Sequence, residues 1–140
     1  MIDTTTGEIK LDCGVRIPPL WMEDAFQSSL LASGAVSLVG NAEFHTFRAE
    51  PALISGSLFA IGLTFRAGLL CKLGLTLMHD DYGTSWDDWS EAKELQRKAD
   101  HDAWLTSLLG GPPPHTFPWG KVTSSYDPKG GCSSILLSYL

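Results

Sequence analysis

The amino-acid sequence predicts an α+β fold: a single antiparallel β-sheet of about 5–7 strands, with a short N-terminal helix and one long helix packed on it. Two patterns lead to this prediction. Apolar residues alternate with polar or small residues over 59–77, which is the period of strands with one buried face. Residues 88–109 instead repeat apolar positions at the spacing of an amphipathic helix. A chain of 140 residues suits one core, so residues 1–140 are interpreted as one domain.

The first part of the chain is predicted to form a short strand pair over residues 5–17 and a short helix over residues 21–31. Residues 12–14 provide a turn between apolar residues that alternate with polar neighbours: Ile9, Leu11, Val15 and Ile17. Two consecutive prolines end the strand pair. The helix is indicated by apolar residues at three- and four-residue spacing, and Gly34 follows as a stop signal.

The middle of the chain is predicted to consist of strands. Residues 36–39 and 44–48 flank a turn at 40–41, and Pro51 is expected to close the second of these strands. The next hairpin reverses at residues 67–68. Its predicted core face consists of Phe59, Ile61, Leu63, Phe65, Leu69, Cys71, Leu73, Leu75 and Leu77.

The long helix is predicted to begin at Trp86 or Asp88 and to end just before two glycines and a proline. Asp88 and Glu91 have the spacing of an acidic capping box, while Glu94 and Lys98 lie one helical turn apart. The predicted core-facing stripe consists of Ala92, Leu95, Ala99, Ala103 and Leu108.

The C-terminal part is predicted to be a stiff, extended connector over 112–118 followed by a hairpin. The hairpin strands, 122–125 and 134–139, flank a loop at 126–131 that is rich in turn residues. Its inward-pointing residues are predicted to be Ile135, Leu137 and Tyr139.

Composition favours some classes of partner and disfavours others. A net charge of -6 and a pI near 5.0 disfavour nucleic acid and anionic membranes, and favour a basic partner. No stretch reaches the roughly 18 consecutive apolar residues of a membrane span, and the polar first residues do not match a secretory signal. Cys13, Cys71 and Cys132 are too widely spaced for a zinc motif or a disulfide framework. We therefore expect a cytoplasmic protein with reduced thiols.

Known catalytic and metal-binding motifs are absent from the sequence. His79-Asp80-Asp81 offers imidazole and carboxylate groups, but its spacing matches no zinc, calcium or facial-triad pattern. Because His79 shares the parity of the core-facing leucines before it, it is interpreted as a hydrogen-bonded histidine at the end of a core strand. His45 and His101 are interpreted as solvated, and Cys132 as exposed without a nucleophilic role. We expect no catalytic residue, metal or cofactor.

One segment, residues 80–91, combines negative charge with aromatic rings. It holds five acidic residues, no basic residue, one tyrosine and two tryptophans, and so carries -5 of the net charge of -6. Carboxylates attract a basic surface over long range, and aromatic rings provide large contact areas, as at protein interfaces. The predicted binding residues are Asp80, Asp81, Tyr82, Trp86, Asp87, Asp88, Trp89 and Glu91. The alternative is that both tryptophans anchor the core and the acids complement a helix N-terminus.

Two groups of residues carry a resemblance to known proteins. They are Gly83-Thr84-Ser85-Trp86 with Asp88-Trp89-Ser90-Glu91, and Trp119-Gly120-Lys121-Val122 with Tyr126-Asp127-Pro128-Lys129-Gly130. Together they resemble a group of small bacterial proteins with no established activity, across most of the chain. In size, acidity and α+β build, the chain also resembles the cytosolic immunity proteins that neutralise secreted bacterial toxins. This resemblance implies a protein partner and transfers no site residues.

The leading hypothesis from the sequence is a small acidic protein-binding domain, monomeric or homodimeric, such as an immunity protein that neutralises a bacterial toxin. A toxin that binds nucleic acid or a nucleotide presents positive charge, which an acidic inhibitor can cover by mimicking the substrate. One alternative is a small-ligand-binding or enzymatic domain with a pocket between the sheet and the long helix, using His79 and Asp81. Another is a secretion chaperone, a class that is also small and acidic and usually dimerises.

Overall fold

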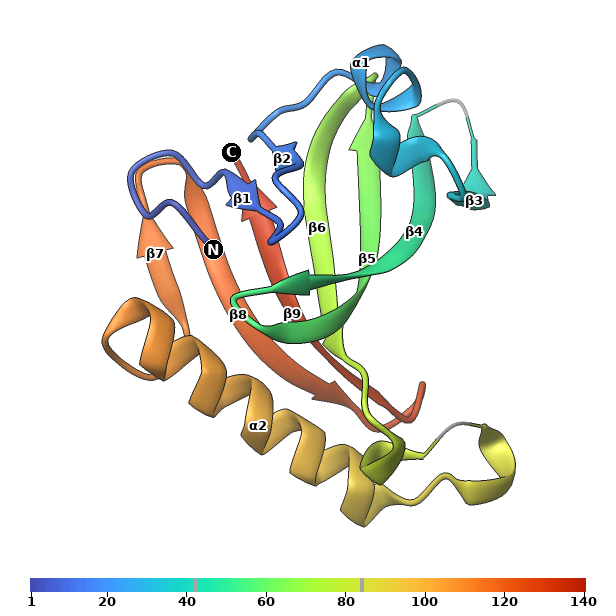
Figure 1. Ribbon diagram of the computed structural model, residues 1–140, viewed down its shortest axis with the longest axis vertical. Helices are drawn as coiled ribbons and strands as arrows, with labels where there is room; N and C mark the ends of the chain where they lie inside the picture. The colour runs from blue at the N-terminus through green and yellow to red at the C-terminus, as the bar shows by residue number, and fades with distance from the viewer. Residues whose placement is uncertain (42, 84) are drawn as a thin grey trace.

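The computed structural model describes residues 1–41, 43–83 and 85–140 and confirms the α+β fold (Figure 1). Within these residues, seven strands form one antiparallel sheet in the order β3-β4-β5-β6-β9-β8-β7, and β1 and β2 form a second, small sheet. The strands are β1 (Ile9–Lys10), β2 (Arg16–Ile17), β3 (Val36–Gly40), β4 (Phe44–Ile54), β5 (Ser57–Arg66), β6 (Leu69–Leu77), β7 (His115–Phe117), β8 (Gly120–Asp127) and β9 (Cys132–Tyr139). The helices are α1 (Glu23–Gln27) and α2 (Glu91–Leu109), with 3-10 turns η1 (Leu30–Ala32), η2 (Asp80–Tyr82) and η3 (Trp86–Asp88).

Both helices pack against the same face of the large sheet, with α1 at the top of Figure 1 and α2 at the bottom. The ring of Phe26 in α1 lies 5.3 Å from that of Phe65, and the indole of Trp104 in α2 lies 4.7 Å from the ring of Phe59. Phe59 and Phe65 share one face of β5 because strand side chains alternate. The predicted alternation of β5 is confirmed, since its four inward side chains are buried: Phe59, Ile61, Leu63 and Phe65.

The N-terminal strand pair forms as predicted and closes one part of the core. Ile9 of β1 pairs with Ile17 of β2, and both side chains are fully buried. The hydroxyl of Tyr139, at the end of β9, donates to the carbonyl of Gly7 over 2.9 Å. The small sheet is thereby fixed against the inner face of the large one.

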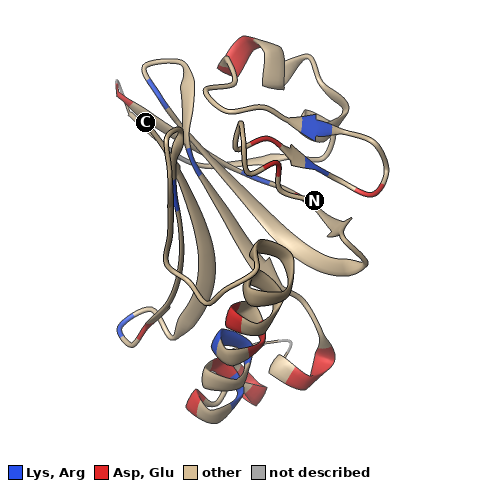
Figure 2. Cartoon of the chain, turned by 90° about the vertical axis from the view of Figure 1, so that its left-hand side faces the viewer, with Lys and Arg blue, Asp and Glu red and all other residues tan. Residues whose placement is uncertain are grey.

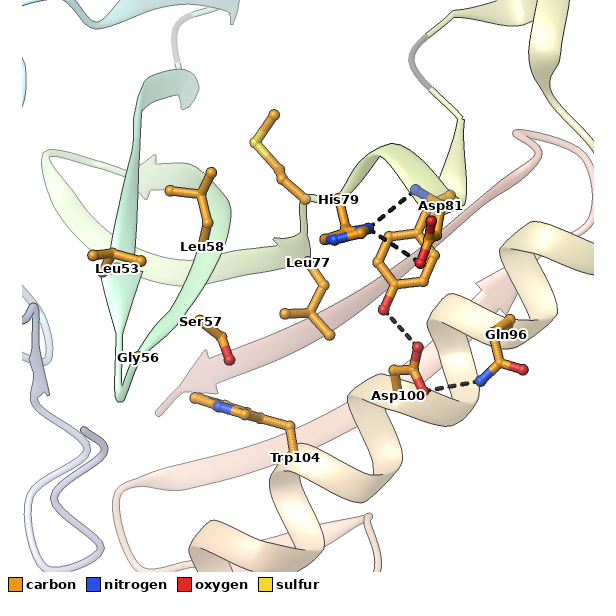
Figure 3. A pocket seen from close by; sticks show the side chains of 12 residues that line it. Leu53, Gly56, Ser57, Leu58, Leu77, His79, Asp81, Gln96, Asp100 and Trp104 are labelled. Atoms are coloured by element: carbon orange, nitrogen blue, oxygen red, sulfur yellow. Dashed lines mark hydrogen bonds and ion pairs between the residues drawn. The ribbon is translucent and has the colours of Figure 1, made fainter.

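Strand β4 continues past Pro51, where the sequence analysis wrongly expected it to end. It runs to Ile54, and its register with β5 shifts between Ala49 and Ala52. A bulge tolerates proline because the bulged residue need not donate to the ladder. The extra length carries the β4–β5 turn, Ser55–Gly56, to a position opposite α2 (Figure 3).

The core face of β6 differs from the prediction in its first residues. Leu70 is buried, whereas Leu69 is exposed and Cys71 is half-buried, with its thiol donating to the carbonyl of Thr64. The register with β5 shifts just after Thr64, and such an irregularity changes which side chains point inward. The predicted alternation is confirmed from Leu73 onward.

Helix α2 forms over the predicted segment, but the predicted stripe does not face the core. Four of its residues are exposed: Ala92, Leu95, Ala99 and Ala103. The fully buried residues are instead Glu94, His101 and Leu105, so His101 is not solvated as predicted. This polar face can be buried because main-chain N–H groups of the sheet donate hydrogen bonds to it. The main-chain N–H of Ser133 donates to Glu94 over 3.0 Å, and that of Leu77 donates to Nε2 of His101 over 2.9 Å.

The ends and ion pairs of α2 also differ in detail from the prediction. Ser90 caps the helix by accepting from the N–H of Lys93, while Asp88 accepts from Ser85 in a capping box of η3. Gly110 ends the helix in the left-handed conformation, at a φ of 81°, as predicted. The predicted Glu94–Lys98 pair does not form, and the observed pairs are Glu94–Arg97 and Lys98–Asp102.

The C-terminal hairpin is longer than predicted, and the connector before it contains strand β7. β8 pairs with β9 along its whole length, so that only a tight turn separates them. The three residues predicted to point inward are buried: Ile135, Leu137 and Tyr139. The turn lies beside η3, which brings the end of this hairpin to the acidic and aromatic segment.

Candidate functional site

A cleft of about 850 Å³ opens between the large sheet and α2 (Figure 3). Its walls come from three parts of the chain: the β4–β5 hairpin, the end of β6 with η2, and α2. It is lined by Leu53, Gly56, Ser57, Leu58, Leu77, Met78, His79, Asp81, Tyr82, Gln96, Asp100 and Trp104. The volume is within the range of small-molecule sites. A cavity therefore lies beside His79, between the sheet and the long helix.

One half of the cleft is apolar. Leu53 and Leu58 are register partners across the β4–β5 hairpin, so their side chains lie next to each other. The N–H of Met78 donates to the carbonyl of Leu58 over 2.9 Å, which places Met78 alongside. All three side chains are exposed, and Leu77 and Trp104 continue the apolar surface. Exposed apolar side chains gathered in one concavity are typical of a binding surface.

The other half is acidic and is built by a row on α2. Gln96, Asp100 and Trp104 lie four residues apart and therefore one above another on one helix face. Asp100 accepts hydrogen bonds from the hydroxyl of Tyr82, at 2.5 Å, and from the side-chain amide of Gln96, at 2.9 Å. Burial raises the pKa of Tyr82 well above its ordinary value, and the bond to Asp100 adds to this, so the phenol keeps its proton. Because both donors are neutral, they leave the carboxylate with its charge.

His79 and Asp81 border the cleft at its rim. Nδ1 of His79 accepts from the main-chain N–H of Asp81 over 3.1 Å and lies 3.4 Å from the carboxylate of Asp81. Both side chains are largely exposed, so His79 is not the residue at the end of a core strand that its parity predicted. Strand β6 ends at Leu77, after which the chain turns into η2.

The nearby positive charge of α2 is already paired. The guanidinium carbon of Arg97 lies 4.8 Å from the ring centroid of Tyr82, and the same guanidinium binds the buried carboxylate of Glu94. Among the described residues that line the cleft there is no lysine or arginine. The cleft is therefore acidic overall.

The segment 80–91 lies next to the cleft, around the start of α2. Figure 2 shows the acidic positions gathered in these turns and along α2. Gly83 connects η2 towards η3 with a φ of 90°, and a Cβ there would lie 3.1 Å from the carbonyl oxygen of Asp88. Glycine is thus required, because a side chain would be both strained and crowded.

The two tryptophans of this segment lie at the surface. Trp86 is 75% exposed and Trp89 is 37% exposed, and their ring centroids are 5.9 Å apart. The indole N–H of Trp89 donates to the carbonyl of Gly131 in the β8–β9 turn over 2.7 Å. Trp89 is therefore fixed against the hairpin, and neither ring is part of the hydrophobic core.

Three of the predicted binding carboxylates, those of Asp80, Asp81 and Asp87, belong to exposed residues. In the portion of the chain described, no lysine or arginine forms an ion pair with Asp80, Asp81 or Asp87, all of which are exposed. Lys93 instead donates to the main-chain carbonyl of Asp88 over 2.6 Å. The carboxylate of Glu91 accepts from a tyrosine hydroxyl of β8 over 3.3 Å. The segment thus presents a negative surface around the indoles.

A smaller hollow of about 360 Å³ is lined by residues of this segment, of α2 and of the β8–β9 turn. Cys132 borders it and is exposed, as predicted. Burial raises the pKa of the Cys132 thiol, and the negative charges of Asp127 and Glu94 raise it further. The thiol is therefore held in its protonated, weakly nucleophilic form.

His45 is half-buried rather than solvated as predicted. Its Nδ1 lies 3.1 Å from the carboxylate of Glu23, and its Nε2 lies 2.9 Å from the hydroxyl of Ser37. Its ring also packs on Phe47, at 4.1 Å between centroids. His45 therefore connects α1 with β3 and β4, and it is not among the residues that line the cleft.

Residues 1–41, 43–83 and 85–140 contain neither a cluster of metal-binding side chains nor a membrane-spanning helix. No group of three or more His, Cys, Asp or Glu side chains in these ranges comes together as a metal site would require. None of the helices in them combines the length and the apolar character needed to cross a membrane.

The sequence analysis identified only part of the cleft. Asp81 and Tyr82 belong both to the predicted binding segment and to the cleft lining, whereas Leu58, Asp100 and Trp104 were missed. The four-residue spacing of Gln96, Asp100 and Trp104 was the one available signal on α2. The leucines of the hairpin gave none, because Leu53 and Leu58 lie outside the strands predicted from the sequence.

Comparison with known proteins gives no family for this chain. No protein-family model, no curated protein and no solved structure matches it. Its function is therefore inferred from two surface features, the segment 80–91 and the adjacent cleft.

Proposed function

We propose that this protein binds a basic protein partner through residues 80–91. The observation that carries the proposal is the pair of surface tryptophans beside Asp80, Asp81 and Asp87, three exposed carboxylates with which no lysine or arginine of the described residues forms an ion pair. Trp86 is the more exposed of the two tryptophans. Burial of its large ring against a partner would remove apolar surface from water and so stabilise a complex. Carboxylates around such anchors attract positive surfaces and speed association.

The distribution of charge supports a basic partner. Residues 80–102 hold eight acidic and three basic residues, a net charge of -5, while the whole chain carries -6. One end of the molecule is therefore strongly negative and the remainder is close to neutral. A partner attracted to this protein would be guided to that end.

The most specific form of this proposal is an immunity protein. The resemblance in size, acidity and fold class supports it, and the exposed acidic surface fits a toxin whose active site binds nucleic acid or a nucleotide. Such an active site is basic, so the carboxylates of residues 80–91 would occupy positions that substrate phosphates otherwise fill.

The proposal is tested by co-purification with the product of the adjacent gene, followed by affinity measurements at increasing salt. The variant is Asp80→Lys/Asp87→Lys, because both side chains are exposed and neither takes part in the capping of η3. The expected result is an affinity at least about tenfold weaker, mainly through slower association, and a shallower salt dependence.

The matched control is Asp24→Lys/Glu50→Lys, which changes the net charge equally on exposed residues elsewhere. It should leave the affinity unchanged. If both double variants weaken binding alike, net charge alone is responsible and residues 80–91 are not the interface. If neither weakens it, the charge argument is wrong.

A second candidate function is binding of a small ligand in the cleft. The observation that favours it is the convergence of exposed leucines, Trp104 and the carboxylate of Asp100 on one cavity of about 850 Å³. Mostly apolar cavities with a few convergent polar groups are the usual form of ligand sites.

A further inference from the structure

The lining of the cleft defines the chemistry of what it can hold. On one side, Leu53, Leu58 and Met78 are exposed and line the opening. Figure 3 shows Leu77 between the two other leucines and α2. Covering these side chains requires an apolar portion in the ligand. The side chains are aliphatic and offer no hydrogen bonds, so the polar contacts must come from the opposite wall.

The opposite wall offers acceptors and negative charge. A carboxylate has about four lone-pair positions, and the two hydrogen bonds of Asp100 to Tyr82 and Gln96 leave acceptor capacity unused. Asp81 adds a second carboxylate at the rim. A cation in the cleft would therefore meet an un-neutralised carboxylate, whereas an anion would be repelled.

Trp104 lies where the two halves meet. Its indole packs edge-on against Phe59, at 4.7 Å between centroids, which fixes its orientation. An indole held in this way can contact an apolar stem, and tryptophan is also the best aromatic partner for a cation. Apolar surface, indole and carboxylate thus follow one another across a single cavity.

From this order of groups we infer that the cleft binds a cationic group on a short apolar stem, an alkylammonium or alkylguanidinium. The stem contacts Leu53, Leu58 and Met78, and the cation donates to the carboxylate of Asp100, with Asp81 nearby. A free amine and a lysine or arginine side chain of a protein share this chemistry. The inference rests on the second candidate function, ligand binding in the cleft, and does not require the protein-binding surface, with which the described cleft lining shares Asp81 and Tyr82.

The test is an NMR titration of the uniformly 15N-labelled protein with phenethylamine, phenethyl alcohol and hydrocinnamate. The three share an aromatic group on a short chain and differ in charge. Phenethylamine is expected to shift the amide signals of the cleft residues and the indole signal of Trp104. Its affinity should exceed that of the alcohol by about tenfold, since a charge-assisted bond replaces a neutral one. Hydrocinnamate should bind most weakly.

The variant Asp100→Asn keeps the shape of the side chain and can still accept from Tyr82, so the fold is preserved. It should weaken phenethylamine binding about tenfold and leave phenethyl alcohol unaffected. Asp24→Asn, which removes an exposed carboxylate of α1, is the matched control and should change neither affinity.

A peptide arm distinguishes the two sources of the cation. Acetyl-Gly-Arg-Gly-amide is compared with the same peptide carrying norleucine in place of arginine. Arginine-dependent shifts in the cleft, lost in Asp100→Asn, would assign the cleft to a side chain of a protein partner. Cleft shifts with phenethylamine alone would assign it to a free amine.

Equal affinity for the cation, the alcohol and the anion would overturn the inference, as would shifts confined to residues outside the cleft. So would an Asp100→Asn variant that binds phenethylamine as well as the wild type. Neither Asp80 nor Asp87 lines the cleft, so the outcome is independent of the charge reversals that test the protein-binding surface.

Discussion

Burial lowers the pKa of His101 to about 4, with the charge of Arg97 acting in the same direction and the carboxylates of Asp102 and Asp100 opposing it. The side chain is fully buried under α2. Its Nε2 accepts from the main-chain N–H of Leu77, the last residue of β6. A neutral imidazole thus satisfies this N–H group at the end of the strand. A proton on Nε2 would abolish that bond and place a charge in the core.

His101 is expected to make stability depend on pH in the weakly acidic range. The unfolded chain binds a proton near pH 6.5 and the folded chain only near pH 4, so the contribution of His101 is complete above about pH 6.5. It is lost as the pH falls, at roughly 1 kcal/mol for each pH unit. Urea unfolding at pH values between about 7 and 5 measures this slope.

The comparison variant is His101→Gln, which can accept from Leu77 but does not titrate. Its free energy of unfolding should be lower at neutral pH and should vary less over the same range. If the free energies of unfolding of the two proteins changed equally with pH, the pKa of His101 would not differ between the folded and unfolded states, and this prediction would be wrong.

At the scale of elements, α2 packs a polar face against the sheet. The carboxylate of Glu94 accepts from Ser133 of β9 and pairs with Arg97, so the buried charge is both bonded and neutralised. Leu105 supplies the fully buried apolar side chain on the same face. The outward face carries Leu95 and several alanines, which favour helix formation without needing a partner.

The orientation of α2 is tested by the same truncation at two positions. Leu105 is 0% exposed and Leu95 is 47% exposed. Leu105→Ala should lower the free energy of unfolding by about 2–5 kcal/mol because it leaves a cavity. Leu95→Ala should change it by no more than about 0.5 kcal/mol. Urea titrations of both variants at neutral pH make the comparison, and a reversed order would mean that the other helix face is buried.

At the scale of the whole molecule, Asp12 of the N-terminal strand pair region stabilises one wall of the cleft. The carboxylate of Asp12 accepts from the N–H groups of Ser55 and Gly56, each over 2.9 Å. These residues form the β4–β5 turn that walls the cleft. The first residues of the chain therefore hold a wall of the candidate ligand site.

Asp12→Ala is expected to loosen that turn. Two N–H groups lose their acceptor, which should lower the free energy of unfolding by about 1 kcal/mol and speed amide exchange at Ser55 and Gly56. Hydrogen exchange followed by NMR measures the local effect. Asp3→Ala is the control, because among the described residues the carboxylate of Asp3 accepts from its near neighbours Thr5 and Thr6 and not from the β4–β5 turn. Unchanged exchange at Ser55 in Asp12→Ala would contradict this support role.

Most of the strands and helices of this protein could be predicted from patterns along its sequence. Alternation placed β5 and most of β6, and the glycines and prolines marked the ends of α2 and the turns, because these features depend on backbone conformation and nearest neighbours. The acidic and aromatic segment was also recognisable, since its composition is local. The exposure of Trp86 and Trp89 could not be predicted from the sequence, because burial depends on which side chains the rest of the chain covers.

The buried face of α2 and the set of residues that share the cleft depend on long-range contacts, and they could not be predicted from the sequence. The polar face is stabilised by Leu77 and Ser133, which lie 24 and 39 residues from their partners on the helix, so no pattern within the helix could identify it. The cleft likewise joins a hairpin, a 3-10 turn and a helix row that are separate in sequence. Local patterns specify the elements, whereas the pairing of buried polar groups across the fold specifies how the elements meet.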